Sequence, residues 1–135
     1  MDPVNIICMK WGDKYDASYV NKLYNMVSRN LSKEFRFICL TDDYSDFLPA
    51  IESFDIPKLN LPEGIPERGW TKLVTFSKHI SDIKGQCLFF DLDLIIVNSI
   101  DELFDLPGDF LIIKDFIRRD VTGNSSVYRF EMGKF

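Results

Sequence analysis

Short apolar runs rich in β-branched residues alternate with helical patterns along most of this sequence. The first two runs, 4–9 and 35–40, flank a segment that follows Asp16 and repeats apolar residues every three or four positions. Such spacing is typical of an amphipathic helix, and aspartate is a preferred residue at a helix N-terminus. Parallel strands need a long connection between them, usually a helix. The alternation therefore predicts an α/β fold, with a mostly parallel central sheet flanked by helices.

The remaining elements are predicted from apolar runs and from the turn residues between them. Strands are expected at 51–56, 87–90, 94–97, 110–113 and 127–130. A helix is expected at 71–83, ended by Gly85, and a short helical turn after Ser99 or Asp101. The run 87–90 is uniformly apolar, which predicts a central strand covered on both faces.

The size and charge of the chain exclude several classes of protein. Its 135 residues are enough for one domain with its own core. Sixteen Lys and Arg against 21 Asp and Glu give a net charge of −5 without a basic stripe, so binding to nucleic acid or to an anionic membrane is not expected. The longest nearly apolar run, 88–97, is too short to cross a bilayer, so no transmembrane segment is expected.

Three cysteines, Cys8, Cys39 and Cys87, each lie in an apolar run. Isolated cysteines in such runs are typical of buried thiols in a reduced protein. The sequence has no CxxC motif or His–Cys cluster that would indicate structural zinc. Because the N-terminus also lacks the basic and apolar regions of a signal peptide, we expect a cytoplasmic protein.

Two aspartates, Asp91 and Asp93, interrupt the apolar stretch 89–97. Unpaired charges are costly to bury, so they need a cation, a polar partner or water. A spacing of two places both side chains on one face if the backbone stays extended. Two carboxylates on one face suit Mg²⁺ or Mn²⁺ that also binds the phosphates of a nucleotide. The alternative is that both are strand-end residues that face solvent or pair with Lys or Arg.

The residues around this pair resemble the DxD motif of GT-A-type glycosyltransferases, especially glycogenin and related bacterial sugar transferases. Three further blocks are similar to the same proteins and follow the same order: 10–15 (Lys-Trp-Gly-Asp-Lys-Tyr), 71–73 (Thr-Lys-Leu) and 123–127 (Gly-Asn-Ser-Ser-Val). The likeness extends over essentially the whole chain. It implies a nucleotide-diphospho-sugar transferase fold and a metal-dependent enzyme that moves a sugar from a nucleotide-diphosphate sugar to a saccharide acceptor.

The resemblance also implies roles for the matching residues. Asp91 and Asp93 would hold Mn²⁺ or Mg²⁺. The donor nucleotide sugar would be contacted by Tyr15, Lys72, Asp91, Leu92, Asn124 and Ser125. No catalytic residue is assigned by these motifs.

Members of this family usually continue into an acceptor-binding half that supplies a further metal ligand, commonly a histidine. The only histidine here, His79, precedes the two aspartates. We therefore expect a single domain truncated at its C-terminus, with slow transfer by itself and self-association through an uncovered face. A module that binds a nucleotide sugar without transferring it, or an inactive remnant, is the alternative function. A DxD phosphatase is a weaker rival, because its downstream lysine and second acidic motif are not found.

Two other groups allow two interpretations each. Thr41, Asp42 and Asp43 follow the second predicted strand, where a simple turn is favoured over contact with a base or ribose. For Trp11 and Trp70, packing is favoured over stacking on a base or a sugar.

Overall fold

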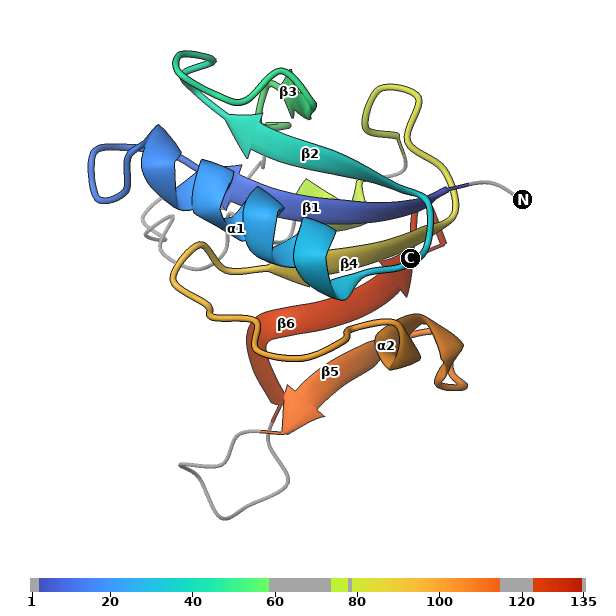
Figure 1. The fold of residues 1–135 in the computed structure, drawn as a ribbon. Helices are drawn as coiled ribbons and strands as arrows, with labels where there is room; N and C mark the ends of the chain where they lie inside the picture. Colours follow the sequence, from blue (N-terminus) through green and yellow to red (C-terminus); the bar gives the residue numbers. More distant parts are fainter. Residues whose placement is uncertain (1–2, 59–73, 78, 115–122, 135) are drawn as a thin grey trace.

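The computed structural model describes residues 3–58, 74–77, 79–114 and 123–134. The elements, in chain order, are β1 (Val4–Lys10), α1 (Ala17–Asn30), β2 (Phe35–Thr41), β3 (Ile51–Phe54), β4 (Gln86–Phe90), α2 (Glu102–Asp105), β5 (Leu111–Lys114) and β6 (Gly123–Glu131). The strands form one six-stranded sheet in the order β3-β2-β1-β4-β6-β5. β1 to β4 are parallel, and β6 is antiparallel to both β4 and β5 (Figure 1). The predicted α/β fold with a mostly parallel sheet is confirmed.

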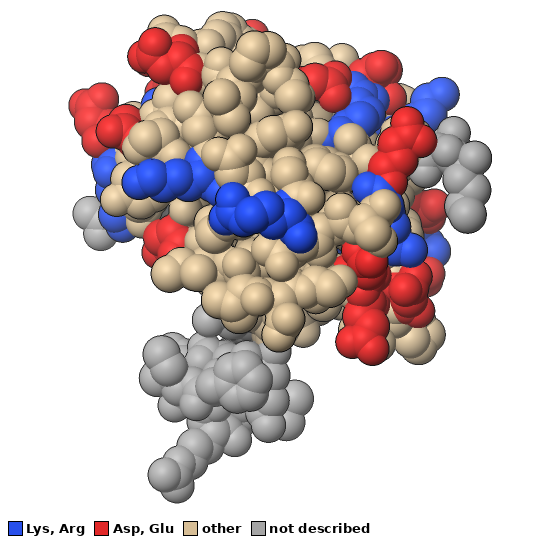
Figure 2. Space-filling view, in the orientation of Figure 1, with Lys and Arg blue, Asp and Glu red and all other residues tan. Residues whose placement is uncertain are grey.

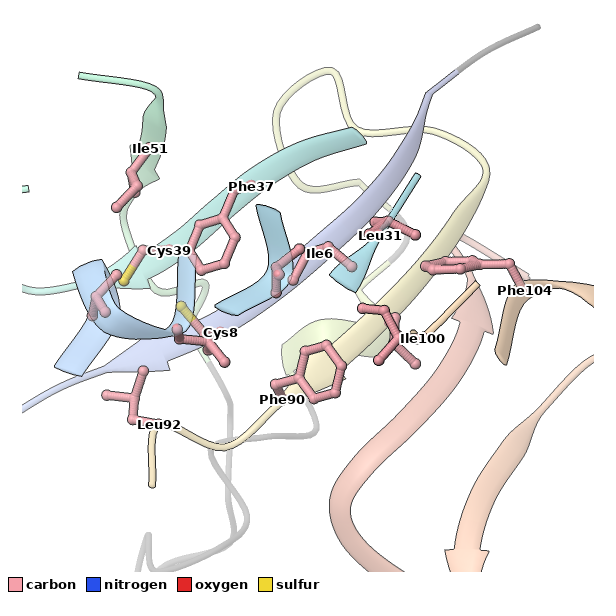
Figure 3. Close-up of a cluster of buried hydrophobic side chains, with 14 residues drawn as sticks. Ile6, Cys8, Leu31, Phe37, Cys39, Ile51, Phe90, Leu92, Ile100 and Phe104 are labelled. Carbon is pink, nitrogen blue, oxygen red and sulfur yellow. The ribbon is translucent and has the colours of Figure 1, made fainter. Parts of the chain in front are cut away.

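Alternate residues of the central strands enter two separate hydrophobic cores. On one face, α1 covers the sheet (Figure 1) and contributes Val20, Leu23 and Val27 to the core there. Figure 3 shows part of this core, including Ile6, Phe37 and Phe90. The strand residues of that core are Ile6, Cys8, Phe37, Cys39, Ile51, Leu88 and Phe90. The strand residues of the opposite core are Ile7, Met9, Ile38, Leu40, Cys87, Phe89, Tyr128 and Phe130. Burial on both faces explains why these strands read as continuous apolar runs, and it confirms the expectation for 87–90.

α1 begins and ends as its sequence indicates. The side chain of Asp16 accepts a hydrogen bond from the backbone N–H of Ser18, at 3.0 Å, and so satisfies one of the free donors at the helix start. The helix ends at Asn30, where the N–H of Leu31 donates to the carbonyl of Val27. The amphipathic pattern thus places one side of the helix on the sheet and leaves the other in solvent.

The segment before β4 differs from the prediction. A helix was expected at 71–83, but among the described residues only a 3₁₀ turn at 74–76 is present there. Ser81 has φ of 50°, which a right-handed helix does not accommodate. Ile80 and Ile83 are buried because they pack against the sheet from a non-helical backbone. Their spacing of three reflects this packing and not a helical repeat.

The segment after β4 also differs. A strand was expected at 94–97, yet these residues are in neither a strand nor a helix. They are bonded to α1 instead: the N–H of Ile96 contacts the Sδ of Met26, and the amide of Asn30 donates to the carbonyl of Ile96. Ile95 and Val97 are about four-fifths exposed, at 79% and 82%. The alternation of half-buried and exposed residues over 94–97 therefore reflects one side of the segment packing against α1, and not pairing with another strand.

The turn of helix at α2 is present, and of the two predicted caps it is Ser99 that bonds: its hydroxyl accepts a hydrogen bond from the N–H of Asp101 at 3.3 Å, just before the helix. Asp101 makes no capping hydrogen bond, because its carboxylate accepts hydrogen bonds from the backbone and hydroxyl of Ser32. Acidic side chains gather around α2, whereas Lys and Arg side chains lie over α1 on the same face of the molecule (Figure 2). No helix in the described part of the chain is long and apolar enough to cross a membrane.

The three cysteine thiols are expected to be unreactive in the folded protein. Cys8, Cys39 and Cys87 have no exposed area. Burial raises the pKa of the Cys87 thiol to about 12, and burial together with the neighbouring Cys39 raises the pKa of Cys8. Because the thiolate is the reactive form, Ellman's reagent at pH 8 should label none of the three within minutes, and all three after denaturation in urea. Fast labelling of the native protein would contradict this packing.

Candidate functional site

β1 is the strand at which the order of the sheet reverses. It pairs in parallel with β2 on one side and with β4 on the other. The segments that follow β1 and β4 therefore emerge side by side at the carboxyl edge of the sheet (Figure 1). Open α/β sheets bind their ligands in the crevice beside such a reversal, because the two connections depart to opposite sides and leave space between them.

A cavity of about 400 Å³ lies at this edge, within the range of small-molecule sites. Its lining comes from the ends of β1 and β4 and the residues after them: Met9, Trp11, Gly12, Asp13, Lys14, Tyr15, Phe89, Asp91, Leu92 and Asp93. Four of the predicted site residues, Tyr15, Asp91, Leu92 and Asp93, are thus brought together, although Tyr15 and Asp91 are far apart in the sequence.

The two aspartates reach the cavity in a different way from the one predicted. β4 ends at Phe90, and Leu92 and Asp93 form a turn, so the backbone does not stay extended. Leu92 packs into the core and is 6% exposed. Asp91 is half-buried and Asp93 is exposed, and both line the same cavity. The turn is anchored by Leu92. It therefore brings Asp91 and Asp93 to one cavity, as was expected from an extended strand.

The loop after β1 forms the other wall of the cavity. Gly12 has φ of 69°, a left-handed conformation that favours glycine. Its N–H donates to Oδ2 of Asp42 at 3.1 Å, which ties the loop to the end of β2. Tyr15 packs edge-on against Tyr19, with ring centroids 4.8 Å apart. Trp11 is 51% exposed at the cavity, so it is available for stacking and is not buried by packing.

A second cavity, of about 360 Å³, shares this loop. Lys10, which is only 7% exposed, and Asp42 and Asp43 line it. Hydrogen bonds from the hydroxyl and backbone N–H of Ser45 lower the pKa of Asp43, and the Lys10 charge adds to this. The hydroxyl of Thr41 accepts a hydrogen bond from the N–H of Asp43 at 3.1 Å. The turn predicted for these residues is therefore present.

The other predicted site residues are placed only in part. Lys72 and Trp70 lie outside the described residues. Asn124 and Ser125 belong to β6, and Asn124 pairs with Ile113 of β5. The carbonyl of Ser126, next in the chain, accepts a hydrogen bond from the N–H of Asp91 at 2.9 Å. The backbone of the Asn-Ser block is thus adjacent to the aspartate pair.

The oxygen ligands at the cavity between the ends of β1 and β4 satisfy part of what a hard divalent cation needs. In the regions that the structure covers, no group of three or more His, Cys, Asp or Glu side chains could hold a metal ion. Asp91 and Asp93 provide two carboxylates from the turn after β4, and Asp13 of the β1 loop lines the same cavity. Mg²⁺ is usually bound through one or two carboxylates, with waters and substrate phosphates as the other ligands. The pair therefore suits a cation that arrives together with a phosphate.

Some lining residues were not predicted as site residues. Met9 and Phe89 line the cavity from the two strands, and Gly12 and Asp13 contribute the loop. From the sequence alone, Met9 and Phe89 cannot be distinguished from residues of the hydrophobic core. Gly12 could have been found from the sequence. A glycine within two residues of the end of a strand indicates a tight backbone turn at the ligand-binding edge of the sheet.

No protein-family model matches this sequence, and no curated protein is significantly similar to it. Solved structures do match. A crystal structure of the galactosyltransferase LgtC in complex with donor and acceptor sugar analogues has a TM-score of 0.72 and 19% identity, over 97% of this chain and 59% of that chain. An active-site mutant of LgtC has a TM-score of 0.73 and 19% identity, over 97% and 58%. The apo form of the glycosyltransferase GlyE from Streptococcus pneumoniae TIGR4 has a TM-score of 0.62 and 13% identity, over 98% and 35%.

These similarities show the fold: the chain has the α/β architecture of these GT-A glycosyltransferases. The chain spans less than two thirds of the length of each of these structures.

Proposed function

We propose that this chain is the nucleotide-sugar-binding part of a metal-dependent glycosyltransferase. The observation that carries the proposal is the cavity at the sheet reversal, where Asp91 and Asp93 face the loop that bears Trp11 and Tyr15. Carboxylates on one side and aromatic rings on the other suit a ligand with a metal-bound diphosphate and a flat base. The fold shared with LgtC and GlyE supports the same class of reaction.

The proposed roles follow the position of each residue. Asp91 and Asp93 hold Mn²⁺ or Mg²⁺, and Tyr15 contacts the base or ribose from the β1 loop. Lys72, Leu92, Asn124 and Ser125 complete the donor site, as the resemblance to glycogenin-like enzymes implies. A divalent cation bound there would offset the negative charge that develops on the leaving diphosphate.

The cavity is expected to contribute more than ligand contacts. Transfer requires a donor held in a fixed orientation beside its acceptor, in a site from which water is excluded. The residues after β1 and β4 build one wall of such a site. An acceptor of saccharide character would have to approach the side of the donor that these residues leave open.

A second candidate function is donor binding without transfer. The chain matches 59% of LgtC and 35% of GlyE, so a large part of those enzymes has no counterpart in it. The two candidate functions are distinguished by measuring the binding and the consumption of a nucleotide sugar on the same protein sample. Binding with turnover supports the transferase, and binding without turnover supports the module.

Titration calorimetry with Mn²⁺ tests the donor site directly. Because two carboxylates fill only part of a coordination shell, Mn²⁺ alone should bind weakly, and a diphosphate should supply further ligands. We expect the affinity for Mn²⁺ to rise at least about tenfold, which corresponds to about 1.4 kcal/mol, in the presence of UDP or GDP. Equal heats with and without both nucleotides, or none in either case, would refute a diphosphate-bridged site.

A further inference from the structure

A groove of about 440 Å³ lies beside the cavity proposed as the donor site, and the proposed function does not use it. One wall of the groove is a stripe of residues along α1, and the other is the segment 92–95 that follows β4. Leu92 and Asp93 line both the groove and the donor cavity. The two spaces are therefore neighbours that share the turn at these residues.

The two walls of the groove are bonded to each other. The N–H of Ile96 contacts the Sδ of Met26 at 3.4 Å, and the side-chain amide of Asn30 donates to the carbonyl of Ile96 at 3.5 Å. Leu92 is buried in the core beneath, and Met26 packs against that core. The groove therefore has fixed walls, and it extends from Asp93 along α1 towards the C-terminal end of the helix.

α1 contributes two cations to the groove, Lys22 and Arg29. Both side chains are exposed, and within the described part of the chain neither forms an ion pair. They are two helical turns apart, so they lie on one side of the helix, about 10 Å from each other along its axis. Figure 2 shows the Lys and Arg side chains over α1 in blue, beside an uncharged surface. The groove thus offers positive charge at two separate points.

The rest of the lining is mainly apolar, with one amide: Tyr19, Asn25, Met26, Leu94 and Ile95. Tyr19 and Ile95 are exposed, and the ammonium group of Lys22 lies 5.8 Å from the centre of the Tyr19 ring. Sugar rings present both C–H faces and hydroxyl groups, so they can pack on exposed apolar side chains and form hydrogen bonds with an amide. The lining therefore suits a saccharide, and the two cations suit one that carries negative charge.

We propose that this groove binds the acceptor of the proposed transfer, and that the acceptor is an acidic saccharide with carboxylate groups along its length. The inference rests on the proposed function and adds the class of its acceptor. Cations at two points along a groove suit charges repeated along a chain better than a single phosphate group.

The shared turn places the reacting end of such an acceptor beside the donor. The acceptor hydroxyl lies at the Asp93 end of the groove, next to the donor cavity. In the transfer its oxygen bonds to the anomeric carbon of the donor, and the bond from that carbon to the diphosphate breaks. The nucleoside diphosphate leaves with the electron pair of that bond, and the hydroxyl proton is released to solvent.

An anionic membrane is the other partner that exposed apolar and cationic side chains can contact. Two observations favour the saccharide. The cations and apolar residues line a groove, which encloses a narrow ligand better than it contacts a flat surface. Acidic side chains also gather around α2 on the same face of the molecule, where anionic lipids would repel them (Figure 2).

The test compares binding of trigalacturonate and of the neutral sugar maltotriose to the whole chain, in titrations followed by NMR. Trigalacturonate should bind at least about tenfold more tightly than maltotriose. Lys22→Gln and Arg29→Gln should each weaken its binding about threefold, and the double variant about tenfold, because partly exposed charge pairs are individually weak and separated sites act independently. Binding of maltotriose should change less than about twofold in these variants. Added salt should weaken only the binding of trigalacturonate.

Lys33→Gln is the matched control, because it removes the same charge from a residue that pairs with Asp105 and does not line the groove. This variant should bind trigalacturonate like the wild type. Lys22 and Arg29 do not line the donor cavity, so binding of Mg²⁺ with UDP or GDP should be unchanged in their variants. The nucleotide and trigalacturonate should also bind at the same time.

Several outcomes would overturn the inference and leave the donor site in place. These are displacement of trigalacturonate by UDP or GDP, equal binding of maltotriose or of inorganic phosphate, and binding that does not depend on Lys22 and Arg29. Binding to vesicles of phosphatidylcholine and phosphatidylglycerol that is lost in Lys22→Gln and Ile95→Ala, without binding of trigalacturonate, would indicate a membrane surface instead. A wild-type chain that binds no nucleotide with metal would refute the proposed function, and the acceptor role of the groove with it.

Discussion

Replacing Asp93 with alanine is expected to abolish the metal-dependent binding of a nucleoside diphosphate. Asp93 lines the cavity with Asp91 and Asp13, and among the described residues no group of three or more acidic, histidine or cysteine side chains is arranged to hold a metal ion. Removing one of the two proposed ligands should weaken Mn²⁺ binding by more than about 100-fold, the upper range seen when only an orienting partner is lost. Calorimetry with Mn²⁺ and UDP or GDP measures the effect.

The fold should survive this change. Asp93 is exposed in a turn, and substitutions at such positions usually shift the free energy of unfolding by no more than about 0.5 kcal/mol. Asp105→Ala removes the same charge from α2, where the carboxylate pairs with Lys33 on the surface, away from the cavity. That control should bind metal and nucleotide like the wild type. Equal binding by the Asp93→Ala and Asp105→Ala proteins would rule out Asp93 as a ligand.

Replacing Phe89 with alanine is expected to cause the largest loss of stability. Phe89 is 1% exposed, lies on a strand in the middle of the sheet and stacks on Tyr128. Truncation of a buried phenylalanine to alanine typically costs about 3–5 kcal/mol, because apolar contacts are lost and a cavity remains. The free energy of unfolding of a domain is only about 5–15 kcal/mol, so this substitution should remove a large part of it. The midpoint of urea denaturation should fall accordingly.

Ile95→Ala provides the comparison, because this large apolar side chain follows the same strand and is 79% exposed. Its free energy of unfolding should change by less than about 0.5 kcal/mol. If the Phe89→Ala and Ile95→Ala proteins lost similar stability, Phe89 would not be packed in the core that it shares with Tyr128.

The sequence predicted the parallel part of the sheet well. Nearly continuous apolar runs became β1, β2 and β4 because strands buried on both faces leave few polar positions. The same runs also located the site, since Lys10 and Phe90 end strands that prove to be neighbours. Polar residues directly after such strands lie at the ligand-binding edge. The sequence did not reveal that β1 and β4 are adjacent, which depends on contacts between distant parts of the chain.

Two errors share one physical cause. Ile80 and Ile83 suggested a helix, and the alternation around Ile95 and Val97 suggested a strand. Side-chain spacing reports which residues face a core, whereas hydrogen bonding decides whether the backbone is regular. In the first segment the positive φ of Ser81 excludes a helix. In the second, α1 supplies the hydrogen-bonding partners that a neighbouring strand would have supplied.

The pairing of β1 with β4 has a consequence for the order in which the molecule assembles. The side chain of Asn5 donates to the carbonyl of Gln86, 81 residues further along the chain. β1, α1 and β2 can associate as soon as residues 4–41 are available, because their contacts are local. Until β4 emerges, one edge of β1 remains open to other strands. The cavity wall formed by Asp91 and Asp93 is therefore expected to form after the pairing of β1 with β2, and a nascent chain has no complete cavity while the second edge of β1 is still open.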